Sequence, residues 1–303
     1  MKQTRREFLV SASTVGAGLT LTGMGMAKQA VPGKKTFGIK VYATRWGYQG
    51  SMDDFCKHVK SEGYDGVEDC LPGDKSQEEA LFEALDKYNL SFAALAGSGG
   101  ASFSDHKESY ERNLQRAISK KPDFINCHAG REFFSFEQNK ELILLAIELS
   151  TQTSIPIYQE THRGRMLFAA HVCKPFLDNI SDLRLTLDVS HWCAVAESLL
   201  GNQQKTITEA LNRTDHVHAR IGHEEGAQVP EPRAPEWQKA KDAHYEWWDK
   251  VVALKKAKGE TLTVTPEFGP ANYMWTTPYT RQPLANQWEI NAHMMNEWRK
   301  RYL

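Results

Sequence analysis

Short apolar runs alternate with longer segments of helical periodicity from residue 37 to the end of the chain. The apolar runs predict eight β-strands, and the periodic segments between them predict helices. The expected strands lie at residues 37–42, 66–70, 91–95, 123–128, 155–160, 184–188, 216–221 and 261–267. The expected helices lie at residues 52–61, 77–87, 107–119, 139–152, 166–177, 206–211, 237–256 and 287–298. Strands that read as continuous apolar runs indicate a parallel sheet covered on both faces.

Eight strand-helix units in about 270 residues favour a closed (β/α)8 TIM barrel over an open doubly wound sheet. The turn after the first predicted strand also lacks the glycine pattern that is typical of dinucleotide-binding open sheets. No Pro/Gly/Ser-rich linker divides residues 31–303, so we expect one barrel domain there. Two long loops, at residues 223–235 and 270–283, follow strand ends, where such loops usually shape a site.

The first 30 residues have a composition of their own. Arg5 and Arg6 are followed by Phe8 and Leu9, and then by a weakly apolar run rich in small residues that ends near Ala27. This segment resembles a twin-arginine signal peptide, which implies recognition by that export machinery and a place in the periplasm or outside the cell. A membrane anchor or a disordered tail is the alternative, but the run is short and polar for a stable anchor.

The bulk composition describes an ordinary globular protein, with 41% hydrophobic residues, 25% charged residues and a formal net charge of -1. This near-neutral balance argues against nucleic acid as a partner, because phosphate binding normally needs a basic surface. The five cysteines contain no Cys-x-x-Cys pair and indicate neither a disulfide framework nor a zinc knuckle. They are Cys56, Cys70, Cys127, Cys173 and Cys193.

Carboxylates and imidazoles stand at the ends of four apolar runs. Glu160, Asp188, His218 and Glu267 each occupy a position where a strand would pass into a loop. The carboxyl ends of barrel strands converge on one pocket, so these side chains would make a site for a divalent metal. Each alone could instead cap a helix or lie satisfied in the core. Four buried ionisable groups around one point, however, would be costly without a cation.

These strand ends resemble the sugar phosphate isomerase/epimerase superfamily, the xylose isomerase-like barrels. The segments that carry the resemblance are residues 63–68, 160–162, 188–191, 217–218 and 267–269, and they extend over essentially all of the chain after the leader. The resemblance implies Glu160, Asp188, His218 and Glu267 as the metal ligands. Such an oxygen-rich set suits Mn²⁺, Mg²⁺ or Co²⁺, and Zn²⁺ is also compatible.

The resemblance further implies a metal-dependent isomerase or epimerase that acts on a sugar or sugar derivative through an enediolate stabilised by the ion. Glu160 and Glu267 would then exchange protons with the substrate as base and acid. We expect further groups nearby to contact the substrate, namely His162, His191, Arg163 and Arg220. Weaker candidates are His128, Glu132, His223 and Glu225. Aromatic residues near strand ends suit the faces of a sugar, although rim packing explains most of them equally well; they are Trp46, Tyr48, Trp192, Trp237, Tyr273 and Trp275.

The chain departs from the ketose 3-epimerase branch at two places. Met166 stands where that branch has a second glutamate, and Glu224 and Glu225 stand where it has an arginine. The sequence therefore predicts the chemistry of the superfamily and leaves other outcomes open. These are a lyase or dehydratase acting on a keto-sugar or keto-glycoside, an endonuclease IV-like hydrolase, and a sugar-binding barrel without catalysis. A homo-oligomer is compatible with the tryptophan-rich helix around Trp247 and Trp248.

Overall fold

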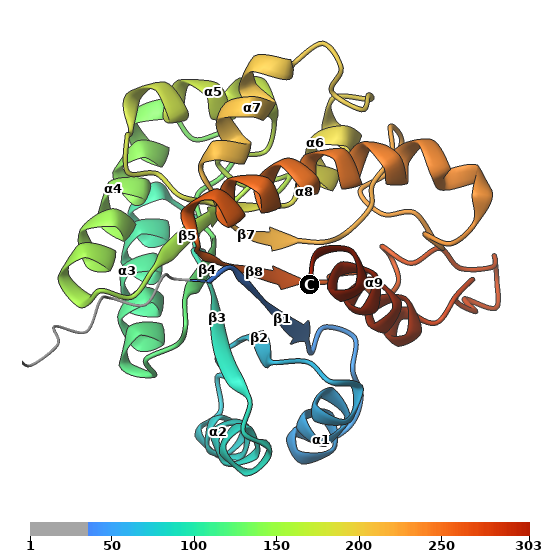
Figure 1. Ribbon diagram of the computed structural model, residues 1–303. Coiled ribbons are helices and arrows are strands. Elements are labelled where there is room, and N and C mark those ends of the chain that lie inside the picture. Colours follow the sequence, from blue (N-terminus) through green and yellow to red (C-terminus); the bar gives the residue numbers. More distant parts are fainter. Residues whose placement is uncertain (1–35) are drawn as a thin grey trace, which may run out of the picture. The chain divides into compact units, whose positions relative to one another are not determined.

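The computed structural model describes residues 36–303 and has the closed barrel that the sequence predicts (Figure 1). Eight parallel strands follow one another in chain order around the barrel, and β1 pairs with β8 to close it. The strands are β1 Gly38–Thr44, β2 Gly66–Cys70, β3 Ser91–Gly97, β4 Ile125–His128, β5 Ile157–Glu160, β6 Leu185–Leu187, β7 Thr214–His218 and β8 Thr261–Thr265.

Helices surround the strands on the outside of the barrel (Figure 1). They are α1 Met52–Glu62, α2 Lys75–Tyr88, α3 Phe103–Ser119, α4 Phe136–Thr153, α5 Ala170–Asn179, α6 Val189–Val195, α7 Gln204–Asn212, α8 Gln238–Lys258 and α9 Gln287–Tyr302, with a 3₁₀ turn at Pro235–Trp237. The sequence places most of their starts and ends within a few residues. The apolar pattern of the sequence does not mark a helix start that is fixed by a polar N-cap residue. Helices α3 and α4 start in this way, with capping boxes at Ser102 and Ser135.

Two elements at the carboxyl end of the barrel differ from the expectation. The seventh strand ends at His218 and not at residue 221, because the Arg220 N–H donates to the His218 carbonyl and turns the chain. The short helix α6 was not predicted, and it begins directly after Asp188, whose carboxylate accepts the Ser190 N–H as an N-cap. Both differences concern polar contacts that an apolar pattern does not record.

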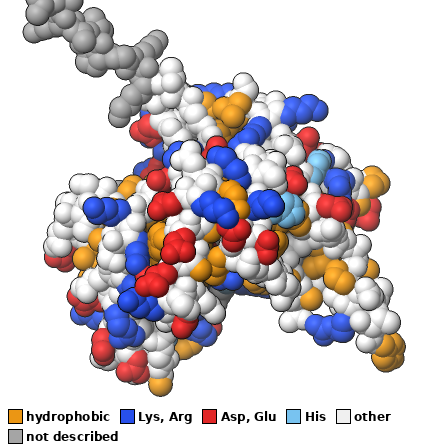
Figure 2. Space-filling view, turned by 90° about the horizontal axis from the view of Figure 1, so that it is seen from below, with side chains coloured by type: hydrophobic (Ala, Val, Ile, Leu, Met, Phe, Trp, Pro, Cys, Tyr) orange, Lys and Arg blue, Asp and Glu red, His pale blue; other side chains and the backbone are white. Residues whose placement is uncertain are grey.

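The apolar core lies between the strands and the helices, and large side chains such as Trp192, Trp248 and Trp298 are fully buried in it. The last helix, α9, packs beside β1, so the two ends of the barrel support each other (Figure 1). All five cysteines are free, as their spacing predicts. On the face shown in Figure 2, basic and acidic side chains are intermixed, as the near-neutral charge leads us to expect.

The predicted twin-arginine leader, residues 1–30, lies outside the described residues, and export therefore stays a prediction. Among residues 36–303, no helix combines the length and the apolarity that crossing a bilayer requires.

Candidate metal centre

The four side chains predicted as metal ligands meet at the carboxyl end of the barrel. Glu160 and His218 are the last residues of β5 and β7, while Asp188 and Glu267 follow β6 and β8. All four are buried, and one possible ligand atom from each lies within 4.8 Å of the others. The convergence that the sequence predicts is therefore present in the structure.

Glu68, a buried residue of β2, sets the orientation of the His218 imidazole. The Nε2 atom of His218 lies 3.1 and 3.2 Å from the two carboxylate oxygens of Glu68. A carboxylate can only accept, so the imidazole donates from Nε2. The other ring nitrogen, Nδ1, lies 3.0 Å from Glu267 Oε2 and 3.5 Å from Glu160 Oε2. Histidines that bind metals commonly donate their second nitrogen to a carboxylate in this way.

Glu68 receives three more donors, all from inside the barrel. His216 Nε2 and Asn126 Nδ2 each lie 3.1 Å from a Glu68 oxygen, and the Thr265 hydroxyl donates to the same carboxylate. These bonds, together with the charges on the two imidazoles, hold the pKa of Glu68 well below its usual value despite its burial. The sequence pattern does not indicate a site role for Glu68 or Asn126. The available signal was a glutamate inside an apolar strand, within one of the segments that carry the family resemblance.

Glu160 Oε1 is buried in the centre and has no hydrogen-bond partner. A buried polar atom without a partner is costly, and a cation bound beside this oxygen would remove that cost. Burial alone would lower the pKa of His218, but the carboxylates of Glu267, Glu160 and Glu68 raise it well above its ordinary value. The centre therefore attracts positive charge, and the donor set fits a divalent ion.

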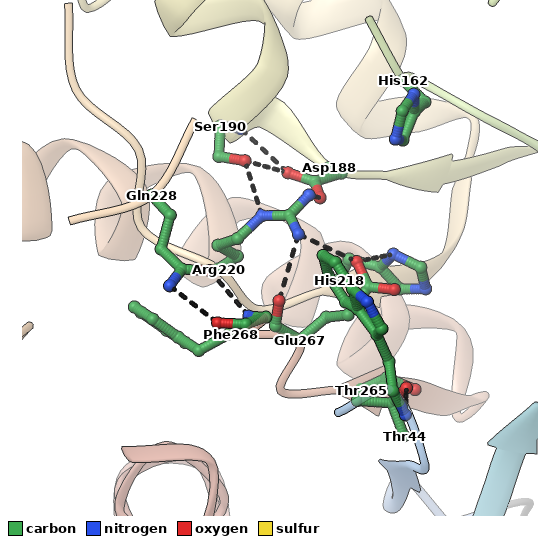
Figure 3. A network of polar contacts seen from close by, with 12 residues as sticks. Thr44, His162, Asp188, Ser190, His218, Arg220, Gln228, Thr265, Glu267 and Phe268 are labelled. Carbon is green, nitrogen blue, oxygen red and sulfur yellow. Dashed lines mark hydrogen bonds and ion pairs between the residues drawn. The ribbon is translucent and has the colours of Figure 1, made fainter. Parts of the chain in front are cut away.

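Arg220 is buried between the ligands and already compensates part of their charge (Figure 3). Its guanidinium contacts Asp188 through Nη2, and its Nη1 lies 3.2 Å from Glu267 Oε2 and 3.1 Å from the Glu267 carbonyl. Nε donates to Ser190 Oγ at 3.2 Å, and Nη2 also lies 2.7 Å from His191 Nε2. Every nitrogen of the guanidinium is thus engaged by the protein. The substrate contact predicted for Arg220 stays a prediction.

The other three residues predicted to contact the substrate, His162, His191 and Arg163, differ in burial and in whether they line the cavity. His162 reaches the cavity, and burial lowers its pKa to about 3, so its imidazole is neutral at physiological pH. His191 is fully buried behind Asp188, and Arg163 is exposed with its guanidinium 4.9 Å from the centre of the Tyr273 ring. Neither lines the cavity, and substrate contact by these two also remains a prediction. His128, a weaker candidate, does line it and lies 2.6 Å from Glu160 Oε2.

A cavity of about 540 Å³ opens beside the centre. A site of this size accommodates a small organic molecule. It is lined by Thr44, Arg45, Trp46, Glu68, Asp69, Cys70, Leu95, His128, His162, Arg220, Glu267 and Tyr273. Glu160 and Asp188 do not line it, so the cavity meets the centre from the side of Glu267.

Two amides fix the chain that carries Glu267. Gln228 pairs with both the N–H and the carbonyl of Gly269, at 2.7 and 3.2 Å. Asn291 does the same for Phe268, at 2.8 and 3.0 Å. The backbone after β8 is therefore held by α9 on one side and by the loop after β7 on the other. No apolar pattern could have indicated these two residues, since each acts only through backbone groups far away in the sequence.

The fold and the centre together define a (β/α)8 TIM barrel with a candidate metal site at the carboxyl ends of its strands. No protein-family model matches the sequence, and no curated protein sequence does so either. Similarity is found among solved structures.

The 3-keto-D-glucoside 4-epimerase of E. coli is 12% identical, with a TM-score of 0.60 over 86% of this chain and 99% of the other. The D-psicose 3-epimerase of Clostridium cellulolyticum is 11% identical, with a TM-score of 0.54 over 86% of this chain and 98% of the other. Endonuclease IV of Thermus thermophilus is 14% identical, with a TM-score of 0.52 over 88% of this chain and 98% of the other. At such identities the likeness establishes the shared fold.

Proposed function

We propose that the protein is a divalent-metal-dependent enzyme that isomerises or epimerises a sugar or a sugar derivative. The observation that carries this proposal is the convergence of Glu160, Asp188, His218 and Glu267 beside a cavity, with Glu160 Oε1 left unpartnered. The fold is shared with two sugar epimerases, which is consistent with the proposal.

In this proposal Glu160, Asp188, His218 and Glu267 hold the ion, and Mn²⁺, Mg²⁺ or Co²⁺ is the expected metal. When bound, such an ion supplies Lewis-acid stabilisation to the negative charge that develops on the substrate oxygens as a neighbouring C–H proton leaves.

Glu267 is the proposed proton carrier on the open side, because it lines the cavity and its backbone is clamped on both sides. Its carboxylate is kept ionised, since the charges of His218 and Arg220 outweigh its burial and lower its pKa. Glu160 is the proposed second carrier. Its Oε2 accepts hydrogen bonds from Asn126 at 2.7 Å and from His128, which fix the direction of the carboxylate.

Solvent-deuterium incorporation tests the proposal. Metal-loaded protein would be incubated in D₂O with a panel of keto-sugars and keto-glycosides, and the products examined by NMR beside a chelated sample. We expect deuterium at one carbon next to the carbonyl in the loaded sample alone, without loss of a substituent. Net loss of water or of an aglycone would identify a lyase instead.

The variant Glu267→Gln separates metal binding from proton transfer. The amide retains one ligand oxygen but cannot accept the substrate proton, so we expect metal to bind and exchange to be lost. Normal exchange by Glu267→Gln would rule out the role proposed for this residue. A variant at the exposed Glu111, changed in the same way, is the control.

A further inference from the structure

We propose, resting on the function proposed above, that the substrate is an uncharged sugar that stacks on Trp46 and that the site disfavours sugar phosphates. Two independent features lead to this assignment. The first is the charge that surrounds the cavity, and the second is the way Trp46 is held at its edge.

Carboxylates outnumber guanidinium groups around the cavity. The cavity and the centre together hold five carboxylates, those of Glu68, Asp69, Glu160, Asp188 and Glu267. Only two guanidinium groups oppose them, from Arg45 and Arg220. Carboxylates therefore outnumber guanidinium groups by three among these side chains. A phosphate dianion would be repelled by the carboxylates, whereas an uncharged sugar would not.

The two arginines at the cavity are already committed to carboxylates. Arg45 Nε lies 2.5 Å from Asp69 Oδ2, and Arg220 contacts Asp188 and Glu267 with both of its terminal nitrogens. Phosphate recognition usually relies on arginines or lysines that are free to form paired bonds with the anion. Arg163 lies at the rim over Tyr273 and is not part of the cavity lining.

Trp46 is built into the cavity wall as a flat apolar surface. A Cβ atom on Gly269 would lie 2.2 Å from the indole, so the ring rests directly on a backbone that has no side chain. The Tyr273 ring meets it in an edge-to-face contact, with a centroid distance of 5.0 Å and an angle of 82°. Gln287 holds the Trp46 carbonyl at 2.7 Å. Trp46 nevertheless remains 38% exposed and lines the cavity, which makes it available to a ligand.

An aromatic face of this kind suits the C–H face of a sugar ring, and polar side chains elsewhere in the cavity suit its hydroxyl groups. Thr44, His128 and His162 supply such polar groups in the same cavity. The site thus combines an apolar wall with polar hydrogen-bonding groups and with arginines that are already bonded to carboxylates. That combination selects a neutral carbohydrate.

Titration calorimetry of Mn²⁺-loaded protein tests the assignment. The ligands are D-fructose, D-psicose and a 3-keto-glucoside, each measured beside its phosphorylated counterpart. We expect at least one uncharged sugar to bind, and its phosphorylated counterpart to bind about tenfold more weakly or not at all. Trp46→Ala is expected to weaken binding of the uncharged sugar about tenfold while Mn²⁺ still binds. Trp275→Ala is the matched control, since Trp275 is exposed near Tyr273 in sequence but does not line the cavity.

Gly269→Ala provides a second route to the same result. Its new methyl group would displace the indole without removing it, so sugar binding should fall as in Trp46→Ala. The assignment is overturned if phosphorylated sugars bind as tightly as the uncharged ones, if Trp46→Ala binds sugar normally, or if no uncharged sugar binds. The proposed function fails separately, when an uncharged sugar binds through Trp46 but exchanges no deuterium with solvent.

Discussion

Glu68 on β2 and His218 on β7 meet in the barrel interior, where the imidazole Nε2 lies 3.1 Å from the nearer carboxylate oxygen. This contact leaves His218 Nδ1 facing Glu160 and Glu267, which is the arrangement that a metal ligand needs. Glu68 itself lies on the far side of the imidazole from that nitrogen. Its effect on the ion would therefore pass through the orientation of the ring.

Glu68→Gln should weaken metal binding while leaving all four proposed ligands in place. An amide can donate as well as accept, so it no longer requires His218 to donate from Nε2, and a loss of about 10- to 100-fold in affinity is expected for such a change. Titration of metal-free protein with Mn²⁺, followed by electron paramagnetic resonance, measures it. Asp123→Asn is the control, because Asp123 bonds Lys40 and Tyr42 at the opposite end of the barrel. Equal Mn²⁺ affinity in the two variants would refute the role of Glu68.

Arg220→Ala should destabilise the metal-free protein by about 3 to 5 kcal/mol, because Asp188 and Glu267 would lose the buried cation that they share. Arg220→Lys keeps the charge but cannot engage Asp188, Glu267 and Ser190 together, so we expect an intermediate value. Urea unfolding in the presence of a chelator gives the three free energies of unfolding. A stable Ala variant would show that the carboxylates do not depend on this guanidinium.

His244 on α8 should make stability depend on pH. Its Nδ1 donates to the Ala240 carbonyl, its Nε2 accepts the Gly222 N–H at 3.2 Å, and complete burial lowers its pKa to about 4. Below pH 6.5 the unfolded chain binds a proton that the folded chain does not, so stability is full above that pH and falls until about pH 4. The difference between the two pKa values corresponds to roughly 3 kcal/mol.

Urea unfolding of wild type and His244→Gln across this pH range measures the contribution of His244. Gln can accept the Gly222 N–H but does not titrate. Between pH 6.5 and pH 4 the free energy of unfolding should therefore fall by roughly 3 kcal/mol less in the variant than in the wild type. Parallel curves for the two proteins would contradict the prediction. The comparison also removes the contributions of other titrating groups, which the two proteins share.

Gly222→Ala should destabilise the loop after β7. A Cβ atom at this position would lie 2.8 Å from the Cβ and the carbonyl oxygen of Ser190, at the start of α6. Such overpacking typically costs about 1 to 3 kcal/mol. Gly73→Ala is the control, because a Cβ there would meet nothing within 4 Å. Thermal unfolding of the two variants should show a lower midpoint for Gly222→Ala alone, and equal midpoints would mean that the loop adjusts freely.

The sequence predicts the barrel well because its eight apolar runs correspond to buried segments. In a barrel of this kind the buried segments are the strands, which the helices cover. The expected strand at residues 66–70 coincides with β2, whereas the one at residues 216–221 ends three residues late. Its end depends on the hydrogen bond between Arg220 and His218, which leaves no trace in the apolar pattern.

The four proposed ligands could be brought together from sequence because parallel strands deliver their carboxyl ends to one place. The groups that orient them could not. Glu68 and Asn126 act from inside the barrel, and Gln228 and Asn291 act on backbone atoms of a distant segment. Such contacts depend on how distant elements pack against each other, and that packing cannot be predicted from the apolar pattern of one sequence.

The pairing of β1 with β8 also constrains how the protein can be made. The centre takes Glu68 from the second strand and Glu267 from just after the eighth. Trp46 in the cavity wall is bonded through its carbonyl to Gln287 of α9. While the chain leaves the ribosome, the early strands can pair in order, but Glu68 must wait for His216 and His218. A nascent chain halted before β7 would carry this carboxylate into an apolar interior without its partners. Completion of the candidate metal centre is thus tied to completion of synthesis.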